Sequence, residues 1–270
     1  MRRLGWRDED STLSKIAPAD LRPPLEFLVK ADSWLAGIFG YPVFQVLPGI
    51  ATSIQPGDLP AFEDRAFYFA KTATNRLDQV HALTHAGFRV VDVSVTFDRS
   101  PGQWIASSGG SVSIDDIRDD QRDAVLAIAE SCFVYSRFHL DPLIPRRVAD
   151  EVKRRWIESY IDKRRGERLL VAEVDGEPAG FLAVLGSSVD GRQARVIDLV
   201  GVAKSHQGKG IGRALVNRFI AASEGECEVL RVGTQASNIP SMRLYEQCGF
   251  RIAGTAYVLH AHVENGRIQG

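Results

Sequence analysis

Short apolar runs separated by turn residues are the most regular feature of the chain, and runs of this kind predict β-strands. Two of them, Arg168–Val174 and Glu177–Leu185, flank Asp175-Gly176, a dipeptide typical of tight hairpin turns. We therefore expect a β-hairpin there. Other runs after residue 110 predict single strands at Ser111–Ile114, Arg195–Ala203, Glu228–Thr234 and Arg251–Ala261.

Between the predicted strands, apolar residues recur with the helical period of about 3.6 residues. Val148, Val152 and Trp156 would lie on one side of a helix over residues 146–163. A second helix is predicted over residues 120–133. Strands that alternate with helices in this way predict an α/β fold, here α+β with a mixed sheet.

The same order of elements occurs twice, once before residue 100 and once near the end of the chain. Arg65–Asn75 is an apolar run that ends in Asn, and Gly87-Phe88-Arg89 follows it; the later counterparts are Leu230–Asn238 and Gly249-Phe250-Arg251. The Asn and the Phe are 13 residues apart in the first copy and 12 in the second. We interpret each copy as strand, Asn-capped helix, Gly-Phe and strand. A chance match is the alternative, because Gly-Phe after a helix is a common packing device.

A linker is predicted between the two copies. Asp98–Ser113 is rich in Pro, Gly and Ser, as linkers are. A chain of 270 residues allows one large domain or two, and we expect two: an N-terminal degenerate domain over residues 1–107 and a catalytic domain over residues 108–270. The first copy has no glycine-rich turn, so we expect it to pack on the second and help shape the acceptor pocket.

Basic and acidic residues nearly balance, with 33 Lys and Arg against 34 Asp and Glu and a formal net charge of −1. No global field favours nucleic acid or an anionic membrane, so neither is an expected partner. The first ten residues are charged where a secretory signal needs an apolar run, and no stretch reaches about 18 consecutive apolar residues. These features indicate a cytoplasmic protein.

The cysteines and histidines do not form a recognisable metal pattern. Cys132, Cys227 and Cys248 lie far apart and form no C-x-x-C pair, which argues against a disulfide framework and a zinc site. His81 and His85 have i, i+4 spacing but no evident third ligand. We expect no metal, and a homodimer is left open.

Gly208, Gly210 and Gly212 form a turn between an apolar run and a predicted helix whose apolar residues continue from Ile211 to Ala222. Without side chains in the way, backbone amides can face a ligand, and the positive end of the helix favours phosphate oxygens. The glycine spacing departs from the Walker and dinucleotide patterns. The turn predicts a pyrophosphate site, with a merely structural glycine turn as the alternative.

A second group of residues lies downstream of this turn. Asn238 suits a helix N-cap, Pro240 is tolerated in a first turn, and Gly249 suits the helix end. Asn238 and Tyr245 are seven residues apart, which is about two helical turns, so they lie on one face. Both side chains can reach the same ligand.

Together these segments, Gln-x-x-Gly-x-Gly from Gln207 and Asn-x6-Tyr-x3-Gly-Phe from Asn238, resemble the coenzyme A site of the GNAT N-acetyltransferases. The resemblance implies a GNAT fold for the catalytic domain, a degenerate GNAT-like half-domain before it, and acetyl-CoA as co-substrate. It also implies that Tyr245 approaches the thioester sulfur. Lys209 and Arg213 are phosphate partners by charge and position, or alternatively solvated surface cations. The residues assigned to the coenzyme are Val200, Gly201 and Val202 beside the pantetheine arm, Gln207, Gly208, Lys209, Gly210, Ile211, Gly212 and Arg213 around the pyrophosphate, and Asn238 and Ser241.

Acetyl transfer from a thioester to an amine needs a neutral amine, stabilisation of the tetrahedral oxyanion and a proton for the departing thiolate. Asp198 is the candidate base, because residues 198, 200 and 202 alternate onto one face of the strand expected beside the pantetheine arm. The alternative is a buried aspartate that only hydrogen-bonds its neighbours. The backbone N–H near Val200 is the candidate oxyanion donor. Tyr245 is the candidate acid, or alternatively a core tyrosine.

The segment from Phe133 to Pro145 is similar to the Phe-x-x-Ser-Arg-Phe segment of the dTDP-fucosamine acetyltransferases, which acetylate the 4-amino group of a nucleotide-linked dideoxy sugar. The similarity implies that Arg137 clamps the nucleotide diphosphate and that Tyr135 or Phe138 stacks on the sugar or base. The alternative is an ion pair between Arg137 and Asp141 within an aromatic core.

These expectations describe an N-acetyltransferase that transfers acetyl from acetyl-CoA to the amino group of a nucleotide-linked amino-deoxy sugar. Two alternatives stay open. One is a GNAT enzyme acting on an amino acid, a polyamine or another small amine, and the other is a catalytically silent, acyl-CoA-binding regulatory module.

Overall fold

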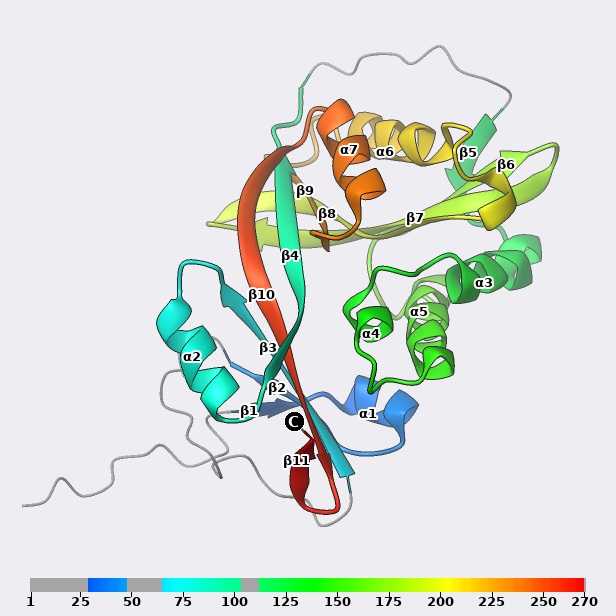
Figure 1. Ribbon diagram of the computed structural model, residues 1–270. Coiled ribbons are helices and arrows are strands. Elements are labelled where there is room, and N and C mark those ends of the chain that lie inside the picture. The colour runs from blue at the N-terminus through cyan, green and yellow to red at the C-terminus, as the bar shows by residue number, and fades with distance from the viewer. Residues whose placement is uncertain (1–28, 48–64, 103–111, 270) are drawn as a thin grey trace, which may run out of the picture.

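The computed structural model describes residues 29–47, 65–102 and 112–269, and all of their strands belong to one mixed sheet. The strands are β1 Val29–Ala31, β2 Val43–Val46, β3 Arg65–Ala73, β4 Arg89–Arg99, β5 Val112–Asp116, β6 Arg168–Val174, β7 Glu177–Val189, β8 Arg192–Val202, β9 Val229–Gln235, β10 Arg251–Glu264 and β11 Arg267–Gln269. The sheet order is β1-β2-β3-β10-β4-β9-β8-β7-β6-β5, and β11 pairs with β10 (Figure 1).

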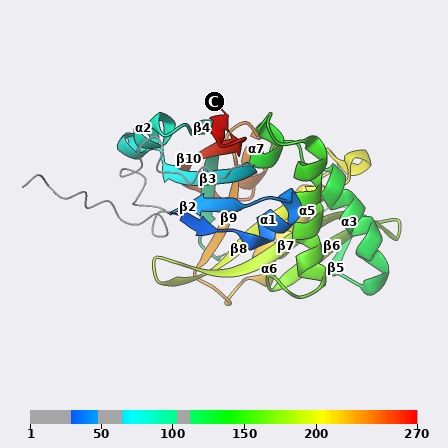
Figure 2. The ribbon, with the colours of Figure 1, turned by 90° about the horizontal axis from the view of Figure 1, so that it is seen from below.

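Helices cover both faces of this sheet. They are α1 Ser33–Phe39, α2 Leu77–His85, α3 Arg122–Ser131, α4 Arg137–Leu140, α5 Arg146–Ile161, α6 Ile211–Ala222 and α7 Ile239–Gln247, with 3₁₀ turns at Asp119–Gln121 and Lys204–His206. Figure 1 shows α6 and α7 above the sheet and α3, α4 and α5 below it, and Figure 2 shows α1 beside α5. Within the described ranges, no helix combines the length and the apolar character needed to cross a bilayer.

The predicted α/β fold with a mixed sheet is confirmed, and most predicted elements occur within a few residues of their expected positions. The predicted hairpin is β6 and β7, with Asp175 and Gly176 both at positive φ in its turn. β7 continues to Val189, beyond the predicted end at Leu185. The prediction did not include α4 or the β1-α1-β2 unit, which are too short to show a clear period.

The two copies of the predicted repeat interleave in the centre of the sheet. β10 lies between β3 and β4, and β4 lies between β10 and β9, with antiparallel pairing throughout. Each copy's two strands are therefore separated by a strand of the other copy. Strands from both sides of residue 107 alternate in one sheet, while residues 103–111 lie outside the described part of the chain. The division into domains 1–107 and 108–270 stays a prediction.

The caps of the two repeat helices differ. Asn238 caps α7 as predicted, because its side chain accepts a hydrogen bond from the backbone N–H of Ser241 at 3.3 Å. The prediction that Asn75 caps α2 is wrong: Arg76 holds the N-cap position and makes no side-chain capping bond. A tight turn from Ala73 to Arg76, closed by a 2.9 Å backbone bond, moves the helix start beyond Asn75.

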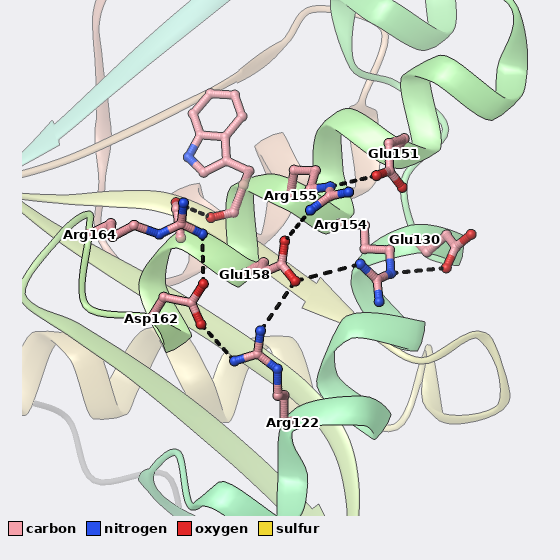
Figure 3. Close-up of polar contacts among 10 residues, drawn as sticks. Arg122, Glu130, Glu151, Arg154, Arg155, Glu158, Asp162 and Arg164 are labelled. Atoms are coloured by element: carbon pink, nitrogen blue, oxygen red, sulfur yellow. Dashed lines mark hydrogen bonds and ion pairs between the residues drawn. The ribbon is translucent and has the colours of Figure 1, made fainter. Parts of the chain in front are cut away.

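Helix α5 has two chemically different faces. Its outer face is held to α3 by ion pairs, with Arg122 bridging Glu158 at 3.2 Å and Asp162 at 2.7 Å (Figure 3). Its inner face is buried against the sheet through Val152 and Ile157. This amphipathic packing fixes which side chains of α5 face the sheet.

Candidate active site

A cleft begins where the parallel strands β8 and β9 separate. Only residues Ala194–Ile197 of β8 pair with residues Val229–Val232 of β9, although both strands continue further. The opposite edge of β8 remains paired with β7 as far as Val202. The end of β8 therefore has an edge toward β9 that pairs with no described strand. Backbone groups on such an edge are free to bond an extended ligand.

The cleft has a volume of about 870 Å³ and extends from the glycine turn to α4 and α5. It brings together nearly all of the site residues that the sequence predicted. The exception is Lys209, which is exposed and does not line the cleft; this agrees with the alternative of a surface cation. The predicted residues that line it are Tyr135, Arg137, Phe138, Asp198, Val200, Gly201, Val202, Gln207, Gly208, Gly210, Ile211, Gly212, Arg213, Asn238, Ser241 and Tyr245.

The glycine turn has the backbone conformation that its sequence requires. Gly208 and Gly210 have φ of 76° and 83°, in the left-handed region that residues with a Cβ rarely adopt. Gly210 is the N-cap of α6 and supplies no side-chain acceptor, so the first N–H groups of that helix remain available. Such a helix start favours an anion.

Gly201 is needed for a different reason, which is close packing. A Cβ there would lie 2.7 Å from the Cys132 Sγ and 2.8 Å from the ring of Phe181. Both distances are far below van der Waals contact, so β8 can lie this close to its neighbours only with glycine at this position.

Tyr245 lies at the inner wall of the cleft and is only 3% exposed. Its ring packs against Phe97 and Phe250, with centroid distances of 5.8 and 6.2 Å. Burial raises the pKa of the phenol well above its ordinary value, an effect that a hydrogen bond with Ser241 partly offsets. The hydroxyl is protonated at neutral pH, as it would also be at its ordinary pKa, and can serve as a donor.

Asp198 is held by several donors. Its Oδ2 accepts hydrogen bonds from Trp156 Nε1 at 2.8 Å, Tyr160 Oη at 2.7 Å and Arg165 Nε at 2.7 Å. Burial alone would raise the pKa of this carboxyl, but these donors, Arg165 foremost, outweigh burial and hold the pKa below its ordinary value. A carboxylate so engaged is a weak base. The geometry argues against proton abstraction by Asp198 and favours the alternative of a buried, hydrogen-bonded aspartate.

Arg137 lies between two aromatic rings. Its guanidinium carbon is 4.1 Å from the centroid of Phe69 and 4.4 Å from that of Phe138. Its Nη1 is 3.3 Å from His260 Nε2. Among the described residues, Arg137 and Asp141 do not form the alternative ion pair. The Asp141 Oδ2 instead lies 2.6 Å from His260 Nδ1 and 2.8 Å from His262 Nε2.

The two predicted stacking residues differ in exposure. Phe138 is 1% exposed and packs in the core beside Phe39, with 6.2 Å between ring centroids. Tyr135 is half-buried at the rim of the cleft. Tyr135 therefore has the more accessible ring of the two.

Sequence reasoning missed Lys153, which is 6% exposed and lines the cleft. Its Nζ lies 5.0 Å from the centroid of Phe133 and 4.8 Å from that of Trp156. Burial, and secondarily the charge of Arg137, lowers the pKa of this amine to about 8. The helical period of the sequence could have placed Lys153 on the inner face of α5, because residue 153 is four positions after the buried Ala149 and three before Trp156.

Sequence reasoning also missed a buried cluster of Asp141, His260 and His262, whose potential ligand atoms lie within 4.8 Å of one another. The two histidines alternate onto one face of β10, and Asp141 approaches from the loop after α4. The polar atoms of the cluster bond one another, and Arg137 adds a positive charge beside it. The prediction that the protein needs no metal stays a prediction.

Comparison with known proteins identifies a family. Residues 124–250 match the model of the acetyltransferase (GNAT) family. The chain is 33% identical over 126 residues to the L-methionine sulfoximine/L-methionine sulfone acetyltransferase of Salmonella typhimurium, a match that covers 45% of the chain and 70% of that protein.

Two further relatives concern carbohydrates by name. The spore coat polysaccharide biosynthesis protein SpsD of Bacillus subtilis is 30% identical over 139 residues, which are 51% of the chain and 46% of that protein. The match thus spans less than half of that relative's length. The dTDP-fucosamine acetyltransferase of Escherichia coli is 25% identical over 197 residues, which are 71% of the chain and 80% of that protein.

Solved structures share the fold. A GCN5-related N-acetyltransferase from Sphaerobacter thermophilus superimposes with a TM-score of 0.52 at 16% identity, covering 77% of this chain and 62% of that one.

Proposed function

The chain belongs to the GNAT acetyltransferase family, and from this membership we propose that the protein transfers acetyl from acetyl-CoA to the amino group of a nucleotide-linked amino-deoxy sugar. The observation that carries the proposal is the cleft, which runs from an uncapped helix start to two cations, the buried Lys153 and the half-buried Arg137. One end suits the pyrophosphate of the acyl donor, and the other suits an acceptor.

The donor end supports binding of coenzyme A through backbone groups. The first N–H groups of α6 are available for phosphate oxygens, with Arg213 beside them on the cleft wall. The unpaired edge of β8 at Val200–Val202 suits the amide groups of an extended pantetheine arm. Acetyl-CoA would supply the acyl group as a thioester.

The centre of the cleft supports acetyl transfer. A backbone N–H on the free edge near Val200 is available to stabilise a developing oxyanion. Tyr245, whose hydroxyl is protonated at neutral pH, would donate a hydrogen bond to the departing sulfur. Asp198 would act by holding Trp156 and Arg165 in place rather than by taking the proton of the amine.

The acceptor end supports a nucleotide-linked amino sugar over other small amines. Arg137 presents a guanidinium suited to a diphosphate, and Tyr135 offers a half-buried ring at the rim. Of the relatives described above, the dTDP-fucosamine acetyltransferase matches the longest stretch of the chain. An amino acid acceptor is the second candidate, because the Salmonella relative is named for L-methionine sulfoximine and sulfone.

Thiol release from acetyl-CoA tests the proposal. The purified chain would be incubated with dTDP- and UDP-linked amino sugars, amino acids and polyamines. We expect rapid release with one class of nucleotide amino sugar and little with the other amines. Release with amino acids alone would move the assignment to the second candidate. Binding of acetyl-CoA without release by any acceptor would favour a silent regulatory module.

A further inference from the structure

The acceptor end of the cleft contains two cations, Lys153 and Arg137, and the charge of Arg137 helps to lower the pKa of Lys153. Lys153 comes from the inner face of α5, and Arg137 comes from α4. Both lie over aromatic rings: Lys153 over Phe133 and Trp156, and Arg137 over Phe138 and Phe69, the latter on β3. Three separate elements thus build the surroundings of this cation pair.

Neither cation has a carboxylate partner within 4.0 Å among the described residues. The carboxylate that acts on Lys153 electrostatically is Asp198, and its Oδ2 is already 2.7 Å from Arg165 Nε. The carboxylate that acts on Arg137 is Asp32, whose Oδ1 accepts a hydrogen bond from the backbone N–H of Leu35. The arginines on the outer face of α5 contrast with this arrangement. Arg154 and Arg155 are exposed or half-exposed and still pair with glutamates, as Figure 3 shows.

Burying an unpaired charge is unfavourable, because the surrounding protein replaces only part of the lost hydration. The aromatic faces under Lys153 and Arg137 offset part of this cost but carry no negative charge. An ordinary structural position on α5 would be filled by an apolar residue, as Val152 and Ile157 are. The two cations therefore suit a ligand that brings its own negative charge into the cleft.

We propose that Lys153 and Arg137 form an anion subsite that binds an oxyanion of the acceptor, so that substrates of this protein carry a phosphate or carboxylate as well as the reacting amine. The inference rests on the proposed function and adds Lys153 to it as a residue that determines acceptor specificity. A diphosphate and a carboxylate share the required chemistry, and the choice of probes separates them.

Calorimetry on the full chain saturated with coenzyme A tests the subsite, because saturation blocks the glycine turn. The probes are inorganic pyrophosphate, dTDP, thymidine and glutamate. We expect dTDP and pyrophosphate to bind and thymidine to bind at least tenfold more weakly. Binding of glutamate without dTDP would assign the subsite to carboxylates. Failure of every anionic probe to bind the saturated wild-type chain would overturn the proposal.

Variants then locate the binding. Lys153→Met keeps the length of the side chain without its charge, and we expect it to weaken anion binding at least tenfold while the acetyl-CoA affinity stays within twofold. Arg147→Met removes an exposed cation from the same helix and should leave anion binding unchanged. Arg137→Gln is the second variant should Lys153→Met fail to fold. Undiminished anion binding in a folded variant would refute the assignment.

The two proposals can fail separately. Lys153-dependent anion binding without thiol release by any amine would leave the subsite standing and remove the proposed reaction. Efficient acetylation of a nucleotide-linked amino sugar, with anion binding that Lys153→Met and Arg137→Gln leave undiminished, would keep the proposed reaction and remove the subsite.

Discussion

Tyr245 combines a position in the core with a hydroxyl donor at the cleft wall. The phenol is protonated at neutral pH even at its ordinary pKa, and the apolar environment raises that pKa further. A buried donor next to the expected position of the thioester sulfur stabilises the thiolate as it departs. The same burial makes Tyr245 part of the core around Phe250, so the two alternatives for this residue are compatible.

Tyr245→Phe tests this role with little change in packing. We expect kcat to fall by roughly 10²–10⁴-fold, the usual range for loss of an acid catalyst, while acetyl-CoA affinity barely changes. Steady-state kinetics and calorimetry measure the two quantities. An unchanged kcat would remove Tyr245 from the reaction and leave it as a core residue.

Lys153 has a stability consequence that follows from its pKa. In the folded state, burial lowers the pKa of this amine from 10.5 to about 8, so the unfolded chain binds the proton more tightly. The charged form therefore destabilises the ligand-free fold below pH 8, by about 3 kcal/mol at 1.36 kcal/mol per pKa unit. The penalty declines as the pH rises from about 8 to 10.5.

Lys153→Met should therefore be more stable than the wild type at pH 7, by up to about 3 kcal/mol, and the difference should shrink toward pH 10. Urea unfolding of both ligand-free proteins at the two pH values measures it. A difference that does not change with pH would show that the amine is not held charged in an unfavourable environment.

At the scale of the element, the start of α6 combines two requirements. Its turn needs left-handed backbone at Gly208 and Gly210, and its first N–H groups need to remain uncapped. Nothing lies within 4 Å of a Cβ built at Gly210, so backbone strain alone decides the effect of a substitution there. A matched position exists at Gly176 in the β6–β7 hairpin, with φ of 85° and equally open space.

Gly210→Ala and Gly176→Ala separate strain from function. Each should lower stability by about 1 kcal/mol, because a Cβ is unfavourable in left-handed backbone. We expect only Gly210→Ala to weaken acetyl-CoA binding, by about tenfold or more, since a small shift of this turn moves the N–H groups away from the phosphates. Equal acetyl-CoA affinity in the two variants would argue that the turn is merely structural.

At the scale of the whole molecule, the two repeat copies depend on each other. β10 pairs with β3 and β4, both of which lie before residue 107, and β4 also pairs with β9. The same interleaving brings Phe69 on β3 beside Arg137 on α4. The first copy thereby contributes directly to the acceptor end of the cleft.

A chain limited to residues 108–270 tests this dependence. Without β3 and β4, β10 keeps only β11 as a neighbour, and unpaired strand edges promote aggregation. We expect this fragment to lack cooperative unfolding and acetyl-CoA binding, and residues 1–107 supplied as a second chain to restore both. Independent folding of 108–270 with full coenzyme affinity would support the division at residue 107 as a boundary between autonomous domains.

Local sequence patterns were sufficient for the strands of the second half, the β6–β7 hairpin, the glycine turn and the positions of Asn238 and Tyr245. Each depends on backbone preferences and side-chain periods within about a dozen residues, and these can be read from the local sequence. Contacts between residues far apart in the sequence leave no such local pattern. Three features follow from how distant segments pack: the interleaving of strands from the two repeat copies, the four hydrogen bonds that occupy Asp198, and the placement of Lys153 and Arg137 in the same cleft.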